Sequence, residues 1–346
     1  MFKLKKNLFI YLILTSMILI AANSAQILIC VKKSLGVCFS SVIPSLFPFM
    51  VLSSMFVESC DEDSFKILGK VTGRILGIRK SANAAFICGL ICGYPIGAKC
   101  TAELYRAKKV SASEAQSLIA YSNNSGPLFV IGAVGVGIFG SLKTGLILYA
   151  VQIFSALCAA RILKAYTIYS VLSSKKINEK KNGFTGSVCN AAVNVINICG
   201  FIVFFSVINE LIKPVISHFP PFVRSVAFCF IEITNAVVEL KAESFPYAVK
   251  LAMVSFALGW SGISVHMQVK SLIKDTGLSM KKYYITRLFI GIMSSLITYI
   301  TLTRFDKITL YLCKEKWIVA FAVFVLCIFL FWHTKKEGEN SPSELI

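Results

Sequence analysis

The sequence predicts an all-α polytopic membrane protein, with about eight transmembrane helices and two re-entrant helical hairpins in an inverted-topology repeat. Hydrophobic residues make up 56% of the 346 residues and charged residues only 15%, a composition too apolar for a soluble domain of this length. Two apolar stretches in matching places are broken by polar and helix-breaking residues. Interrupted backbone at membrane depth is tolerated only where protein or a cavity surrounds it, and a paired occurrence indicates a transporter site.

Ten apolar runs mark the candidate membrane segments, and most suit a helix that crosses the ~30 Å hydrocarbon core. They fall at about 7–31, 34–57, 82–104, 116–139, 142–167, 187–212, 222–241, 246–269, 283–303 and 317–333. The third run is rich in Gly and Pro, and the seventh carries Glu232, Asn235 and Glu239. We therefore interpret these two as hairpins, at about 84–106 and 222–243, that enter and leave on one side.

The distribution of Lys and Arg separates the two arrangements. Ten full spans divide these residues equally between the two sides, whereas eight spans with two hairpins place a clear excess on the side of the N-terminus. Cytoplasmic loops normally carry such an excess. The charges therefore favour the hairpins, with both chain ends in the cytoplasm, and make the second half an inverted copy of the first.

The expected organisation has five parts, with the broken helices at about 116–139 and 246–269. They are an N-terminal transmembrane helix (1–33), a first repeat (34–167), a cytoplasmic linker (168–186), a second repeat (187–303), and a last transmembrane helix with a cytoplasmic tail (304–346). This arrangement places a site between the hairpin tips and the broken helices, near the midplane.

The N-terminus and the charge both indicate an uncleaved protein of the cell membrane. Lys3, Lys5 and Lys6 precede the apolar run Leu8–Ile20, but Asn23-Ser24-Ala25 is a poor cleavage site. The +19 net charge suits anionic headgroups and does not indicate nucleic acid, so the expected partners are the lipid bilayer and a small-molecule substrate. The twelve cysteines lack a CxxC pair and read as small hydrophobes, and the oligomeric state is left open.

The first hairpin carries Gly93, Tyr94 and Gly97 around Pro95, a set that allows a tight non-helical turn. Helix starts after such a turn present free N–H groups and the positive end of the helix dipole. Lys99 beside them predicts a site for a carboxylate or phosphate. The alternative is that Lys99 extends to the cytoplasmic interface.

The first broken helix is interrupted by the run Ser122-Asn123-Asn124-Ser125-Gly126-Pro127, which cannot stay regular helix because Pro127 removes a backbone donor. We expect Asn123, Asn124 and Ser125 to bind a cation or a polar substrate. The alternative is a kink packed against neighbouring helices.

In the second unit, Glu232, Thr234 and Asn235 lie at the expected hairpin turn. An intramembrane carboxylate is a functional hypothesis by default, so Glu232 is a candidate for substrate binding and for ion coupling. Ser261 and Ser264 in the second broken helix share a face with Gln268 and complete the expected substrate site. His266 is a second coupling candidate, or a packed, hydrogen-bonded histidine.

Catalysis is not expected. Gly259-Trp260-Ser261-Gly262 resembles the nucleophile motif of rhomboid-type intramembrane proteases, but those need a His on another helix, and His266 is on the same one. No HExxH motif or paired aspartates suggest another protease class. No metal or cofactor is expected, and coupling to Na⁺ or H⁺ is left open.

Four segments carry a resemblance to a known family: Ile43–Phe49, Cys92–Lys99, Ser122–Pro127 and Gly262–Gln268. With them the chain resembles, from about 8 to 333, the sporulation integral membrane proteins of the YlbJ (SpoVV) type, in the nucleoside-recognition or Gate-domain group. That group is itself similar to concentrative nucleoside transporters.

The resemblance implies export of dipicolinic acid from the mother cell across the outer forespore membrane. A dicarboxylate suits Lys99 and the Asn/Ser cluster, whereas a nucleoside suits Glu232, Asn235 and Asn124. A non-transporting membrane scaffold is the third alternative. The residues alone leave the three open.

Overall fold

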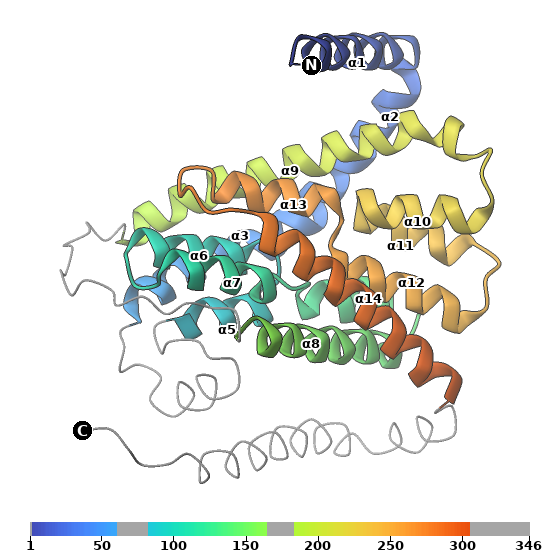
Figure 1. Ribbon diagram of the computed structural model, residues 1–346. Coiled ribbons are helices and arrows are strands. Elements are labelled where there is room, and N and C mark those ends of the chain that lie inside the picture. Colours follow the sequence, from blue (N-terminus) through green and yellow to red (C-terminus); the bar gives the residue numbers. More distant parts are fainter. Residues whose placement is uncertain (1, 61–81, 165–182, 305–346) are drawn as a thin grey trace, which may run out of the picture.

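The computed structural model describes residues 2–60, 82–164 and 183–304, and these form a bundle of helices (Figure 1). Four described segments are long and apolar enough to cross a bilayer: Leu142–Ile162, Gly183–Ile216, Tyr247–Leu272 and Lys281–Thr303. A fifth span is added if the bent pair Ile10–Ala22 and Ser24–Ser40 counts as one. The expected span at 317–333 lies outside the described residues, so the number eight stays a prediction.

The N-terminal helices differ from the expected division at about residue 33. Helix α1 (Phe2–Ala22) ends at Asn23, and α2 (Ser24–Val37), the π-helical turn η1 (Cys38–Val42) and α3 (Ile43–Ser59) follow without an interruption. The α1–α2 bend is 92°. At the bend the Asn23 side-chain amide donates to the Leu19 carbonyl at 2.8 Å, whereas helix α2 continues through Lys32 and Lys33.

The first unit continues as α5 (Asn83–Ile91), α6 (Ile96–Arg106), α7 (Ala112–Ser122), the π-helix η3 (Leu128–Ile138) and α8 (Leu142–Lys164). A capping box starts α7, in which Ser111 and Glu114 each accept from the other's backbone N–H. The helix is then interrupted from Asn123 to Gly126, and Pro127 starts the next helical segment. This is where the Asn/Ser run predicted a break.

The second unit contains α9 (Gly183–Ile216), α10 (Pro221–Ile231), α11 (Ile233–Ala242), α12 (Tyr247–Trp260), α13 (Gly262–Leu272) and α14 (Lys281–Arg304). Proline fixes a helix-compatible φ, and Pro220 and Pro246 occupy the N-cap positions of α10 and α12. Ser261 adopts a left-handed conformation (φ 75°) and separates α12 from α13.

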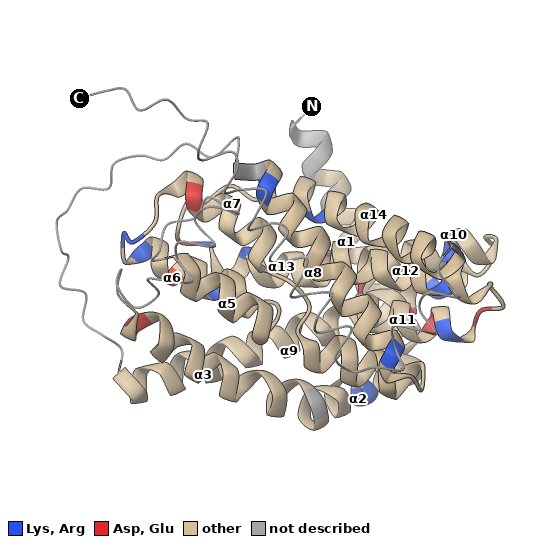
Figure 2. Cartoon of the chain, turned by 90° about the horizontal axis from the view of Figure 1, so that it is seen from below, with Lys and Arg blue, Asp and Glu red and all other residues tan. Residues whose placement is uncertain are grey.

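The two pairs of short helices, α5–α6 and α10–α11, lie toward opposite ends of the bundle (Figure 1). The α6–α7 and α13–α14 connections lie at one end, where Arg106 pairs with Asp275 at 2.7 Å. The α10–α11 pair lies at the other end, where Thr144 at the start of α8 contacts Tyr247 at the start of α12 through their hydroxyls, at 2.6 Å. Lys, Arg, Asp and Glu concentrate toward these ends (Figure 2), as expected for a bundle whose middle lies in lipid.

Each unit packs its broken helix closely against the span that follows. A Cβ on Gly135 of η3 would lie 2.5 Å from the Cα of Gly145 on α8. A Cβ on Gly259 of α12 would likewise lie 2.5 Å from the Cα of Gly291 on α14. Small residues allow such close backbone approach between membrane helices.

Candidate functional site

The turn between α5 and α6 packs against the break in the first broken helix. Gly93 has φ +81°, a conformation that L side chains rarely adopt, and a Cβ there would lie 2.3 Å from the backbone N of Gly126. Gly97 is equally tight, since its Cβ would lie 2.4 Å from the carbonyl O of Ser122. Tyr94 packs its ring on Phe129, with 6.5 Å between the centroids.

The break itself is a buried polar segment. Asn123 donates to the Tyr283 hydroxyl at 3.1 Å, and Asn124 donates to the Tyr121 carbonyl at 2.7 Å. The side-chain amide oxygen of Asn123 and the Ser125 hydroxyl are buried, and neither has a partner within hydrogen-bond geometry among the described residues. Unpaired polar atoms at such depth are costly.

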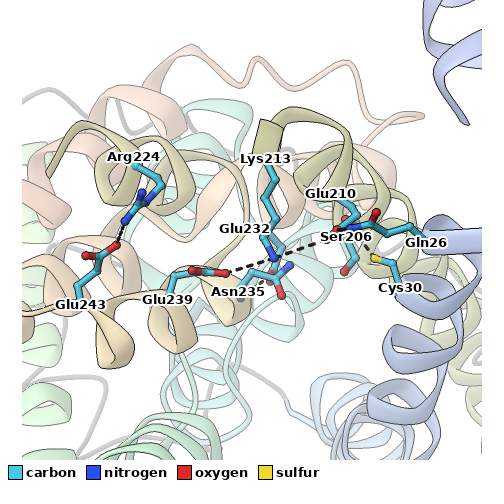
Figure 3. Close-up of polar contacts among 10 residues, drawn as sticks. All are labelled: Gln26, Cys30, Ser206, Glu210, Lys213, Arg224, Glu232, Asn235, Glu239 and Glu243. Atoms are coloured by element: carbon cyan, nitrogen blue, oxygen red, sulfur yellow. Dashed lines mark hydrogen bonds and ion pairs between the residues drawn. The ribbon is translucent and has the colours of Figure 1, made fainter. Parts of the chain in front are cut away.

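The turn between α10 and α11 is built on Glu232. Its carboxylate accepts from the backbone N–H groups of Thr234 at 2.9 Å and Asn235 at 2.8 Å, which caps the start of α11 (Figure 3). The side chain is buried. The positive end of the α11 dipole therefore compensates this carboxylate.

The second break brings the expected serines and histidine into tight packing. Ser261 is fully buried, and Ser264 accepts from Gln268 at 3.5 Å. The Nε2 atom of His266 lies 2.8 Å from the Trp260 carbonyl O, and its ring packs against the rings of Trp260, Tyr283 and Tyr284. His266 is thus a packed, hydrogen-bonded histidine in this conformation.

Arg287 on α14 joins the two breaks, and sequence reasoning missed it. Its guanidinium donates to the amide oxygen of Asn124 at 3.1 Å and to the hydroxyl of Ser261 at 2.7 Å. The side chain is fully buried. A sequence signal did exist, because Arg287 is an isolated cation inside the apolar run 283–303.

A cavity of about 590 Å³ lies beside the first break, the α10–α11 turn and α13. The site residues Tyr94, Glu232 and Thr234 line it, together with Gly126 and Gln268. Apolar side chains from η1, α3, η3 and α9 form much of the remaining wall. The cavity thus combines an apolar enclosure with a few polar groups, as small-molecule sites do. Asn124 and Ser261 do not line it and are bonded to Arg287 instead.

The structure places Lys99 away from this cavity. Lys99 is buried and forms an ion pair with Glu103 at 3.0 Å, and its ammonium also donates to Ser54 and to the Met50 carbonyl on α3. It borders a second, polar cavity of about 740 Å³ at the α6–α7 end. Other polar residues lining that cavity are Glu58, Arg106, Lys109, Asn190, Asn194, Asn197, Ser271, Lys274 and Asp275.

Ionic contacts tie the helices together at both ends. At the α6–α7 end, the hydrogen bond from Arg106 lowers the pKa of the exposed Asp275 carboxyl. At the other end, Lys213 on α9 lies 3.6 Å from Glu210 and 3.5 Å from Glu239 on α11 (Figure 3). Among the described residues, no group of three or more His, Cys, Asp or Glu side chains could hold a metal ion.

The comparisons agree with a membrane protein of this kind. The chain is 26% identical to the sporulation integral membrane protein YlbJ of Bacillus subtilis (strain 168), over 76% of this chain and 74% of that protein. No family model matches the sequence, and no solved structure matches it. The similarity supports the resemblance seen in the sequence, and with the apolar helices it identifies a multi-pass integral membrane protein.

Proposed function

We propose that this chain, a multi-pass membrane protein of the YlbJ type, moves a small polar or anionic solute across the bilayer. The observation that carries the proposal is the 590 Å³ cavity, which is bordered by polar residues of both hairpin turns at the level of the helix breaks. Irregular backbone facing a cavity at membrane depth is the arrangement that secondary transporters use for their substrates.

We further propose that residues 34–167 and 187–303 act as two inverted repeats, with α5–α6 and α10–α11 as re-entrant hairpins. The opposite placement of these pairs supports this division (Figure 1). In such transporters one repeat rocks against the other around a central site. Gly126 and Glu232, which belong to different units, border the same cavity and are placed for such movement.

The solute that we propose is dipicolinic acid, exported from the mother cell across the outer forespore membrane. The similarity to a sporulation membrane protein supports this choice. A nucleoside is the second candidate, favoured by Glu232 and Gln268 in the cavity wall, since these side chains can bond hydroxyl and amide groups.

Uptake into proteoliposomes tests the proposal with two matched variants of η3. Gly132 borders the cavity and a Cβ there meets only Leu128 Cδ1, at 3.8 Å, so Gly132→Leu fills the cavity without a backbone clash. Gly137 is exposed and outside the cavity wall, so Gly137→Leu is the control. We expect wild type and Gly137→Leu to take up dipicolinate, and we expect Gly132→Leu to show no uptake. If wild-type protein moves neither dipicolinate nor uridine in either direction, the transport proposal is contradicted and the membrane scaffold is the remaining alternative.

A further inference from the structure

Arg287 is a buried cation whose partners are all neutral. Besides Asn124 and Ser261 it donates to the Leu258 carbonyl at 3.3 Å, and its Nε has no partner among the described residues. No described carboxylate lies within ion-pair distance of it. Lys99, the other fully buried Lys or Arg among the described residues, differs because it pairs with Glu103 at 3.0 Å.

An unpaired guanidinium at this depth is expensive, because arginine keeps its proton and burial removes its hydration. Hydrogen bonds to neutral oxygens satisfy some of its donors and leave its charge uncompensated. Glu232 forms no ion pair with Arg287, and its carboxylate accepts from the N–H groups at the start of α11. The arrangement therefore lacks one anion.

We propose that Arg287 is the residue that binds the carboxylate of the transported solute, an inference that rests on the transport proposal above. The fork of a guanidinium matches a carboxylate in a bidentate manner. A carboxylate that takes the place of the Asn124 and Ser261 oxygens breaks the bonds joining the two helix breaks. Solute binding then weakens the contact between the two units, in which the Asn123–Tyr283 hydrogen bond remains, and so couples binding to movement.

The cavity lies next to the segment that contacts this residue. Gly126 lines the cavity, and Ser125, whose buried hydroxyl has no partner among the described residues, separates Gly126 from Asn124. The Tyr94 hydroxyl, also buried, lies next to that of Ser125 and belongs to a second cavity-lining residue. These hydroxyls supply donors for a carboxylate on its way from the cavity to the guanidinium.

The test is ligand binding to the full-length protein in nanodiscs, measured by calorimetry with dipicolinate and with its neutral analogue pyridine-2,6-dicarboxamide. The variants are Arg287→Gln, Arg287→Lys, Asn124→Asp and, as a matched control, Arg161→Gln, whose arginine is exposed on α8. We expect wild type and Arg161→Gln to prefer dipicolinate over the diamide. Arg287→Gln weakens dipicolinate binding about tenfold to a hundredfold and leaves the diamide unchanged, because a charge-assisted bond is lost. Arg287→Lys keeps the preference with lower affinity.

Asn124→Asp separates binding from folding. It places a carboxylate beside the guanidinium, where the wild-type amide oxygen lies at 3.1 Å. We expect this variant to melt at least as high as wild type and to lose dipicolinate binding, because its own carboxylate occupies Arg287. It also decides the question if Arg287→Gln fails to fold.

Two outcomes overturn the role of Arg287. Dipicolinate binding by folded Arg287→Gln or Asn124→Asp at wild-type strength leaves transport standing and removes Arg287 from the site. Wild type that transports uridine and binds no dipicolinate does the same. Wild type that neither binds nor moves either compound overturns the transport proposal as well.

Discussion

Gly93 and Gly126 meet backbone to backbone, because a Cβ on Gly93 would lie 2.3 Å from the amide nitrogen of Gly126. The second unit has a looser counterpart, in which a Cβ on Gly262 would lie 3.0 Å from the carbonyl O of Ile231. In both units, therefore, the turn of the short-helix pair packs on the break of the next helix. Any movement of one hairpin is transmitted to its broken helix through this contact.

Gly93→Ala tests that contact, with Gly140→Ala as its control. Both glycines have positive φ, +81° and +65°, but a Cβ on Gly140 meets nothing within 4 Å. Gly140→Ala should lower the free energy of unfolding only by the cost of an alanine in the left-handed conformation, about 1–2 kcal/mol. Gly93→Ala must also push two backbones apart, so its free energy of unfolding should fall clearly further. Thermal unfolding in detergent measures both. Equal losses of stability in the two variants would mean that the turn at Gly93 does not pack against Gly126.

Glu232→Gln separates the two candidate solutes. If the solute is a nucleoside, the variant should abolish uridine uptake, because the cavity loses its carboxylate acceptor. If it is a dicarboxylate, dipicolinate binding should persist and the dependence of uptake on a Na⁺ or H⁺ gradient should change. Glu239→Gln is the control, since Glu239 lies on the same helix and pairs with Lys213 away from the cavity.

The same change should also weaken the start of α11. Glu232 accepts two backbone N–H bonds there, and loss of an N-cap acceptor costs about 1 kcal/mol. Glu232→Ala should therefore melt lower than wild type, with Glu232→Gln between them because its amide oxygen can still accept. A melting temperature of Glu232→Ala equal to that of wild type would contradict the capping role.

The sequence predicted the helix breaks because their causes are local. Pro127 removes a donor, Gly93 tolerates positive φ, and adjacent asparagines resist regular helix in hydrocarbon wherever they occur. The hairpin bounds were likewise close to the α5–α6 and α10–α11 helices. The bend at Asn23 was missed because it lies within an unbroken apolar run.

The partners of Arg287 could not be found in this way, because they depend on packing between distant segments. Asn124 and Arg287 are 163 residues apart and meet only when the first break packs against α14. The partners of Lys99 were hidden for the same reason, since Ser54 and Met50 come from α3. Local patterns identify interrupted backbone, and tertiary packing decides which charges remain unpaired.

Lys99 can be tested for a structural and a transport role together. Lys99→Ala leaves Glu103 and Ser54 without their cation and should cost roughly 1–3 kcal/mol. Lys99→Met combined with Glu103→Gln removes both charges and should recover most of that loss. If the double variant is stable and still fails to take up dipicolinate, Lys99 contacts the anion as the sequence suggested. Uptake at the wild-type rate would limit Lys99 to holding α6 on α3.

The orientation of the protein in the membrane can be predicted from the distribution of Lys and Arg. The α6–α7 and α13–α14 connections and the start of α14 carry Lys108, Lys109, Lys274, Lys281 and Lys282, while Lys143, Lys213, Arg224, Lys241 and Lys250 lie toward the other end. The excess of Lys and Arg on one side, counted over the whole sequence, indicates that the first end faces the cytoplasm. Lys143 starts the other end, near Tyr247. In a cysteine-free background, Lys108→Cys should react with a membrane-impermeant maleimide only after the cells are opened, and Lys143→Cys should react in intact cells. The reverse pattern would mean that the protein has the opposite orientation in the membrane. Reaction of both cysteines in intact cells would place positions 108 and 143 on the same side, which contradicts a single crossing between them.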